Sequence, residues 1–201
     1  AAVISVIDHR EDADGPALIS ADTEKLGLDR AKPVYAWTFG VRDIREAWFA
    51  LPEAMRREVY GETGWGLDLI GRALGVEVIE EPGERVELEV PTEPHLLRMV
   101  ILSNSPAGVF SVAGLRTHLW KPSNLGASVH AEMSADGGQM VVEARAPAGG
   151  AEIIVCPPPG KVINPGKGVL KPVFVAERRL IILPVPAGEH KLELAVTDAR
   201  P

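Results

Sequence analysis

The fold is decided by residues 127–145, which read ASVHAEMSADGGQMVVEAR. Polar and apolar residues alternate on both sides of the turn sequence Asp136-Gly137-Gly138. Because successive side chains of a strand point to opposite faces, this alternation predicts strands with one apolar face. Glycine lets the backbone reverse tightly, so the turn is predicted to join two strands, Ala127–Met133 and Gln139–Arg145.

The same pattern continues in both directions along the chain. Short β-rich runs alternate with glycine or proline turns, which is typical of a two-sheet protein. We therefore predict a mainly-β fold, an antiparallel β-sandwich or jelly roll, forming one domain over residues 1–201. Its strands are expected within residues 2–40 and 76–197, with turns at Pro82-Gly83 and at Pro186–Gly188, each closing a hairpin.

Helical spacing interrupts this pattern at about residues 42–75. Asp43 is a suitable N-cap, and apolar residues follow it at the intervals of one helix face. Gly75 stands where a helix commonly ends. The sequence therefore predicts a small helical insertion between the strands.

Charge is divided unevenly along the chain, whose net charge is −7. Residues 1–100 carry 20 acidic and 11 basic residues, whereas residues 101–201 carry 8 acidic and 10 basic residues. A net negative charge argues against nucleic acid as a partner, because the phosphate backbone is itself anionic. An acidic half beside a slightly basic half has two interpretations. It steers head-to-tail contacts between copies, or it is an ordinary solvated acidic surface.

Two further features restrict the class of protein. No apolar run approaches the roughly 20 residues that a membrane-spanning helix requires, so no membrane span is predicted. The lone cysteine, Cys156, excludes an internal disulfide and a multi-cysteine zinc site. Neither feature fixes the location, and a virion, a cell surface and the cytoplasm all stay open.

Residues with catalytic or metal-binding chemistry are scattered. The five histidines show no metal-ligand spacing, and no nucleophile or nucleotide-binding motif is present. Ser128, His130 and Glu132 share one strand face, but backbone positions two apart are about 7 Å from each other. We predict no catalytic residue and no cofactor. Asp12 and Asp14 are the candidates for a metal site, although the spacing around them does not fit a calcium-binding EF-hand.

The segment from Pro157 to Pro172 contains five prolines, three lysines and no acidic residue. Long loops are commonly functional, and proline-stiffened ones lose little entropy on binding. We therefore predict that Lys161, Lys167 and Lys171 form a basic loop that contacts an acidic neighbour. The alternative is that the segment is only a stiff surface crossover between the sheets.

Aromatic residues concentrate in one region, with seven of the ten between residues 35 and 65. Tyr35, Trp37 and Phe39 alternate along one predicted strand and form a stripe on one face. Such a stripe, or Trp120, binds a sugar ring if it is exposed, and forms part of the core if the insertion packs on it.

Three functions are consistent with these patterns. The first is a non-enzymatic structural protein, of virion, tail or surface-layer type, that assembles with itself or with other chains. The second is a carbohydrate-binding or accessory sandwich module of a carbohydrate-active enzyme. The third is a hydrolase or lyase with a dispersed site that includes His9 or His118.

Overall fold

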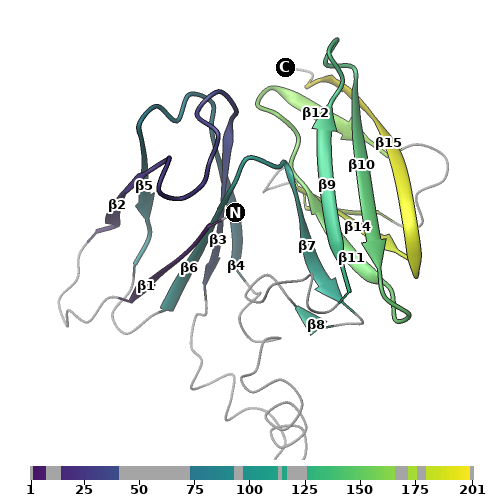
Figure 1. Ribbon diagram of the computed structural model, residues 1–201, viewed down its shortest axis with the longest axis horizontal. Helices are drawn as coiled ribbons and strands as arrows, with labels where there is room; N and C mark the ends of the chain where they lie inside the picture. Colours follow the sequence, from purple (N-terminus) through teal and green to yellow (C-terminus); the bar gives the residue numbers. More distant parts are fainter. Residues whose placement is uncertain are drawn as a thin grey trace, which may run out of the picture. The chain divides into compact units, whose positions relative to one another are not determined.

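The computed structural model describes residues 2–7, 15–40, 73–92, 97–112, 115–116, 126–165, 172–175 and 180–199. Within these ranges the chain consists of strands and turns, and its strand pairs are antiparallel (Figure 1). The described part contains no helix. It therefore contains no helix that is long and apolar enough to cross a membrane. The prediction of a mainly-β, antiparallel protein is confirmed.

The described residues form fifteen strands in four sheets. They are β1 (Ala2–Ile7), β2 (Ala17–Asp22), β3 (Val34–Gly40), β4 (Ala73–Ile79), β5 (Arg85–Val90), β6 (Leu97–Ser103), β7 (Ala107–Val112), β8 (Leu115–Arg116), β9 (Ser128–Met133), β10 (Gln139–Ala146), β11 (Ala151–Val155), β12 (Lys161–Asn164), β13 (Val173–Val175), β14 (Leu180–Val185) and β15 (Gly188–Asp198).

Contacts divide the chain into two compact units, Ala1–Asn104 (unit 1) and Ser105–Pro201 (unit 2). Each unit has its own cluster of buried apolar side chains. The organisation as one domain over residues 1–201 stays a prediction, because a compact unit is not by itself a domain that folds alone.

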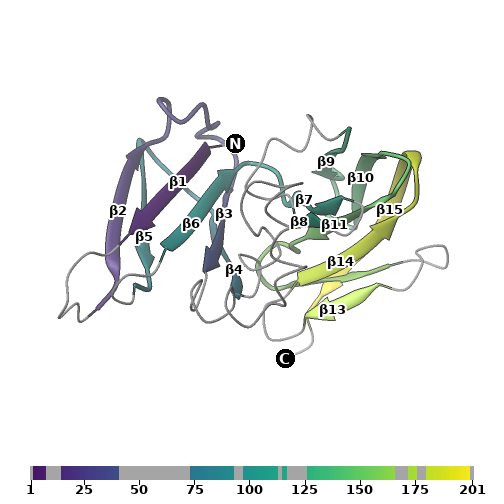
Figure 2. The same cartoon turned by 90° about the horizontal axis from the view of Figure 1, so that it is seen from below.

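Unit 1 contains a four-stranded and a two-stranded sheet. Sheet A has the strand order β1-β6-β3-β4, and sheet B pairs β2 with β5. Both views show β2 and β5 beside sheet A (Figure 2). Burial alternates along β5, where Val86, Leu88 and Val90 are buried while the residues between them are exposed. These three side chains belong to one apolar cluster with residues of β3 and β6, which holds the two sheets together.

One asparagine fastens the loop between β2 and β3 to the end of β6. The Oδ1 atom of Asn104 accepts a hydrogen bond from the Asp29 amide at 2.8 Å. Its Nδ2 donates to the carbonyl oxygens of Asp29, Lys32 and Pro33 at 3.0, 3.3 and 3.1 Å. The loop therefore has a fixed path into β3 without regular secondary structure of its own.

Unit 2 contains two larger sheets. Sheet C has the order β13-β14-β11-β7-β8, and sheet D has the order β12-β15-β10-β9. A continuous apolar cluster includes buried residues of both sheets, among them Ile153 and Leu183 of sheet C and Met140 and Leu194 of sheet D. Two antiparallel sheets around one apolar layer are consistent with the predicted sandwich class.

The β9–β10 hairpin was predicted correctly. Its ladder pairs Met140 with Met133 and extends to the other end of β9. At the turn, Ser134 N donates to the Gln139 carbonyl at 2.8 Å, and Gly137 has a φ of 69°. That left-handed conformation favours glycine, as the Gly-Gly turn sequence implies.

The two other predicted hairpins are wrong. Strands β4 and β5 flank Pro82-Gly83, but β4 pairs with β3 and β5 pairs with β2. Similarly, β14 pairs with β11 and β13, whereas β15 pairs with β10 and β12. In each case the turn carries the chain from one sheet to another, because consecutive strands bury their apolar faces from opposite layers.

The predicted helical insertion over 42–75 is not confirmed. Almost all of it lies outside the described residues. Its last three positions, 73–75, begin strand β4, and Gly75 pairs with Thr38 instead of ending a helix. Strands β2 and β12 were not predicted, and β12 lies within the segment 157–172 that we expected to be irregular.

The buried apolar cluster of unit 1 predicts different effects on stability for two leucine-to-alanine substitutions. Leu102 is fully buried in the cluster, whereas Leu18 of β2 is 70% exposed. We expect Leu102→Ala to lower the free energy of unfolding by about 3 kcal/mol, because it removes buried methyl groups and leaves a cavity. We expect Leu18→Ala to change it by less than about 0.5 kcal/mol. Urea denaturation of both variants measures the two values, and equal losses would contradict this assignment of the core.

Candidate functional site

The outer face of sheet D carries polar side chains in three neighbouring strands. His130 of β9 lies opposite Glu143 of β10, which lies opposite Lys191 of β15. His130 Nε2 is 3.0 Å from Glu132 Oε1, and Lys191 Nζ is 3.8 Å from Glu143 Oε1. All four side chains are well exposed, so these pairs contribute little to stability.

The His130–Glu132 contact corrects one expectation from the sequence. Backbone spacing implied that the row Ser128, His130 and Glu132 is too widely spaced for proton transfer, but two of its side chains bend together. No hydrogen bond joins Ser128 to His130 in the described part of the chain. A serine–histidine–carboxylate relay is therefore not assembled on this face.

The other described histidine has a structural contact. His190 Nε2 lies 2.9 Å from the carbonyl oxygen of Pro186 in the β14–β15 crossover. A carbonyl oxygen only accepts, so this contact requires a proton on Nε2. His95 lies outside the described residues. So do His9 and His118, which are the two histidines of the hydrolase or lyase hypothesis.

The weak metal candidates, Asp12 and Asp14, also lie outside the described residues. Within the described ranges, no three histidine, cysteine, aspartate or glutamate side chains converge as metal ligands. Cys156 is buried and its Sγ lies 3.4 Å from the carbonyl oxygen of Pro157, as expected for a small core residue.

The aromatic stripe is buried where it is described. Tyr35 and Trp37 are only 4% and 3% exposed, and their rings stack with centroids 6.4 Å apart. Val34 and Ala36, on the opposite face of β3, are buried as well. A flat sugar-binding platform needs exposed ring faces, which these two residues do not offer. The side chain of Phe39, and Trp120, lie outside the described part.

The predicted basic loop contains an edge strand. Lys161 begins β12, and its Nζ lies 2.6 Å from Asp198 Oδ1 of the neighbouring β15. Asn164, at the other end of β12, donates from Nδ2 to Thr197 Oγ1 at 3.2 Å. Lys161 therefore has an acidic neighbour within its own chain. Lys167 and Lys171 lie outside the described residues.

No protein-family model, no curated protein and no solved structure is significantly similar to this chain. No likeness to a known protein therefore indicates a functional site in this chain.

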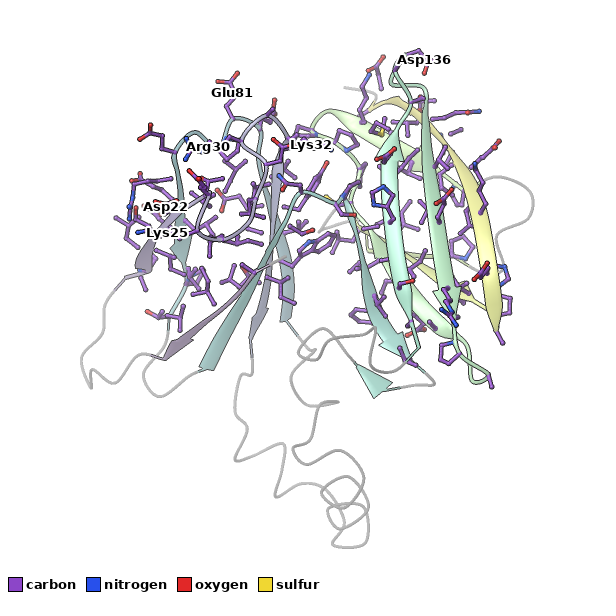
Figure 3. All side chains as sticks on the ribbon, in the orientation of Figure 1. Asp22, Lys25, Arg30, Lys32, Glu81 and Asp136 are labelled. Carbon is purple, nitrogen blue, oxygen red and sulfur yellow. The ribbon has the colours of Figure 1, made fainter. Side chains whose placement is uncertain are left out.

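Unit 1 carries exposed glutamates on β4, on β5 and in the segment between them. They have no cationic partner among the described residues, and they are Glu77, Glu80, Glu81, Glu84, Glu87 and Glu89. Figure 3 labels Glu81 in the connection between the two strands. The acidic residues were visible in the sequence, but their common exposure was not.

Two exposed apolar residues complete the candidate surfaces. Among the described residues, the large apolar side chains that are exposed are Leu18, at 70%, and Val162, at 44%. Leu18 lies on β2, which pairs only with β5 in the described structure, and Val162 lies on β12, which pairs only with β15. Strand edges with unpaired backbone groups bind other strands readily. Residues 17–22 read ALISAD and begin with three apolar residues in a row, so alternation of residue types did not reveal β2.

Among the residues that the structure describes, the carboxyl groups of the half-buried Asp22 and the exposed Asp136 have a shifted pKa, and in both the cause is a turn. The pKa of Asp22 is lowered mainly by the backbone amide of Lys25, which donates to its Oδ1 at 3.1 Å. The pKa of Asp136 is lowered mainly by the Ser134 hydroxyl, which donates at 2.6 Å, and then by the Gly138 amide. Hydrogen bonds to the ionised form explain both shifts, so neither marks a catalytic acid.

The Asp136 turn generates a prediction about pH. Replacing Ser134 by alanine removes the main donor, so the pKa of Asp136 should rise toward its ordinary value. Because the folded pKa is lowered, the ionised Asp136 stabilises the hairpin above its unfolded pKa, and this contribution is lost as pH falls through the folded value. NMR titration of the carboxyl groups in both proteins measures the change. Asp22 is the internal control, and an unchanged Asp136 would assign the lowered pKa to the Gly138 amide.

Proposed function

We propose that this chain is a non-enzymatic structural protein that assembles with copies of itself or with other chains, as components of virions, tails or surface layers do. The observation that carries the proposal is that the division of charge along the chain coincides with its division into two compact units. The acidic residues 1–100 all fall in unit 1, and the slightly basic residues 101–201 contain the whole of unit 2 and only four residues of unit 1. Each compact unit therefore has a charge of its own, which suits contact between unlike units.

Much of the negative charge of unit 1 lies in the exposed glutamates on β4, on β5 and in the segment between them. These glutamates are exposed and contact no cationic group among the described residues, so they are available to a cationic partner. The proposed complement is the basic loop with Lys161, Lys167 and Lys171. Lys161 already contacts Asp198, which leaves Lys167 and Lys171 as the main contributors. Exposed ion pairs contribute about 1 kcal/mol or less each, so such contacts steer association more than they strengthen it.

The carbohydrate-binding alternative has less support. It requires exposed aromatic rings, and the two stripe residues whose side chains are described, Tyr35 and Trp37, are buried. Burial of both rings favours a packing role for the stripe.

The proposal predicts self-association that weakens with salt. Sedimentation velocity at tens of micromolar protein should show oligomers at low ionic strength and fewer at about 0.5 M salt, where charges are screened within a few ångströms. Glu87→Gln with Glu89→Gln should weaken association several-fold, because both residues are exposed on unit 1.

The matched control removes the same number of negative charges, two, from unit 2. Glu189→Gln with Glu193→Gln removes two exposed carboxylates from β15 and should leave association unchanged or stronger. A wild-type protein that is monomeric at every salt concentration would overturn assembly with itself. Equal effects of the two glutamine pairs would show that charge asymmetry does not direct the contact.

A further inference from the structure

We propose that Arg85 closes the free edge of β2, and so prevents β2 from pairing with β2 of a second copy of the chain. The inference goes beyond the proposed function, because it concerns a contact that the folded chain avoids and does not require the chain to assemble. It gives Arg85 the role of keeping sheet B two-stranded.

β2 is an edge strand whose outward backbone groups can be identified. In the described structure it pairs with β5 and with no other strand. The Thr23 amide donates to the Glu84 carbonyl at 3.0 Å, which makes these opposite residues a hydrogen-bonded pair. Such pairs alternate along an antiparallel ladder, so the amides and carbonyls of Leu18, Ser20 and Asp22 point away from β5. These groups form the edge that another strand could join.

The outward carbonyl oxygen of Ser20 is already occupied. Nη2 of Arg85 donates to it at 3.0 Å, and Nε of the same guanidinium donates to Ser20 Oγ at 2.8 Å. The Ser20 hydroxyl in turn makes a long hydrogen bond, at 3.5 Å, to Glu87 Oε1. Two donors of one rigid, planar group therefore hold Arg85 against Ser20. Because the carbonyl points outward, the guanidinium lies where the amide of an incoming strand would lie.

Arg85 does not bind the carboxylate that the ladder places nearest to it. Asp22 lies directly opposite Arg85 in the register. Its Oδ1 accepts hydrogen bonds from the amides of Glu24 and Lys25 at 3.0 and 3.1 Å, and no ion pair joins it to Arg85 among the described residues. The guanidinium reaches the diagonal position instead, where it binds a backbone carbonyl. That geometry is what closing the edge requires.

The rest of the edge is partly closed as well. The Asp22 carbonyl accepts a hydrogen bond from the Leu26 amide at 3.2 Å, so the turn after β2 covers that end. Leu18 is 70% exposed, and its outward backbone groups have no hydrogen-bond partner in the described part of the chain. Leu18 alone offers only one amide and one carbonyl to an incoming strand. Access to Ser20 therefore decides whether a second strand can pair with β2.

A second copy of β2 fits this edge once Ser20 is free. In antiparallel two-fold pairing, Leu18 of each copy lies opposite Ser20 of the other, and Ile19 lies opposite Ile19. Outward backbone groups then meet outward backbone groups. The exposed Leu18 and Ser20 share one face, and the half-buried Ile19 lies on the other. The Ser20 carbonyl is an acceptor in this register, and Arg85 blocks it, while the acidic charge of unit 1 adds repulsion between copies.

Sedimentation velocity of Arg85→Ala tests the proposal. The variant should associate about tenfold more strongly than the wild type at about 0.5 M salt, where repulsion between acidic units is screened. Arg30→Ala is the matched control, because it removes an exposed guanidinium from the same unit. Arg30 contacts the Glu24 carboxylate at 3.0 Å, so its loss should leave association unchanged. The proposed assembly weakens with salt, which distinguishes it from this contact.

Hydrogen–deuterium exchange separates pairing from loss of the fold. The amides of Leu18 and Ser20 point away from β5, so in Arg85→Ala their exchange should slow as protein concentration rises. The amides of Ile19 and Ala21 face β5 and should stay protected while sheet B is folded. Faster exchange at Ile19 and Ala21 would show that the substitution unfolds sheet B, and it would overturn the proposal.

A second substitution should reverse the effect of the first. Leu18→Lys in the Arg85→Ala background places a charge on the opened edge, which is a common protection of edge strands. Leu18 is exposed, so thermal unfolding should change little. The double variant should return to the association of the wild type.

Each outcome decides the inference. Stronger association of Arg85→Ala than of Arg30→Ala, with slower exchange at Leu18 and Ser20, supports it. Equal association of these two variants at high salt overturns it. Association of Arg85→Ala that Leu18→Lys does not reduce overturns it as well, because the contact would then lie elsewhere.

Discussion

The burial of alternate side chains along each strand is the interaction on which the rest of the structure depends. In β10 the residues Met140, Val142, Ala144 and Ala146 are buried, while the side chains between them face outward. The same arrangement in β5 joins sheet A to sheet B in unit 1. Apolar burial supplies the driving force, and the antiparallel ladders satisfy the backbone groups that burial would otherwise leave unpaired.

This constraint also explains the crossovers. A strand that buries one face needs a partner layer, and the next strand in the chain often supplies it from the opposite sheet. The turns at Pro82-Gly83 and at Pro186–Gly188 therefore connect layers instead of closing hairpins. Once sheets are stacked in this way, strands such as β2 and β12 are left at the edges with one neighbour each in the described structure.

The proposed assembly involves residues on the surface of the two units, outside their apolar clusters. Among the large apolar side chains of the described residues, Leu18 and Val162 are exposed. The charge division between the units, and exposed glutamates of unit 1 that contact no cationic group among the described residues, favour contact between unlike units. Charge asymmetry favours a contact between unlike units of two copies, and such a contact can repeat from copy to copy.

The sequence by itself determined the mainly-β class, the β9–β10 hairpin and the unequal charge of the two halves, because these follow from local alternation, turn residues and composition. Only the tertiary structure decided which strands pair, that Tyr35 and Trp37 are buried, and that Lys161 contacts Asp198. A strand's partner depends on residues far along the chain: Lys161 and Asp198 meet only because β12 pairs with β15. Alternation shows that a strand has two different faces, but what covers each face is set by the packing of whole sheets.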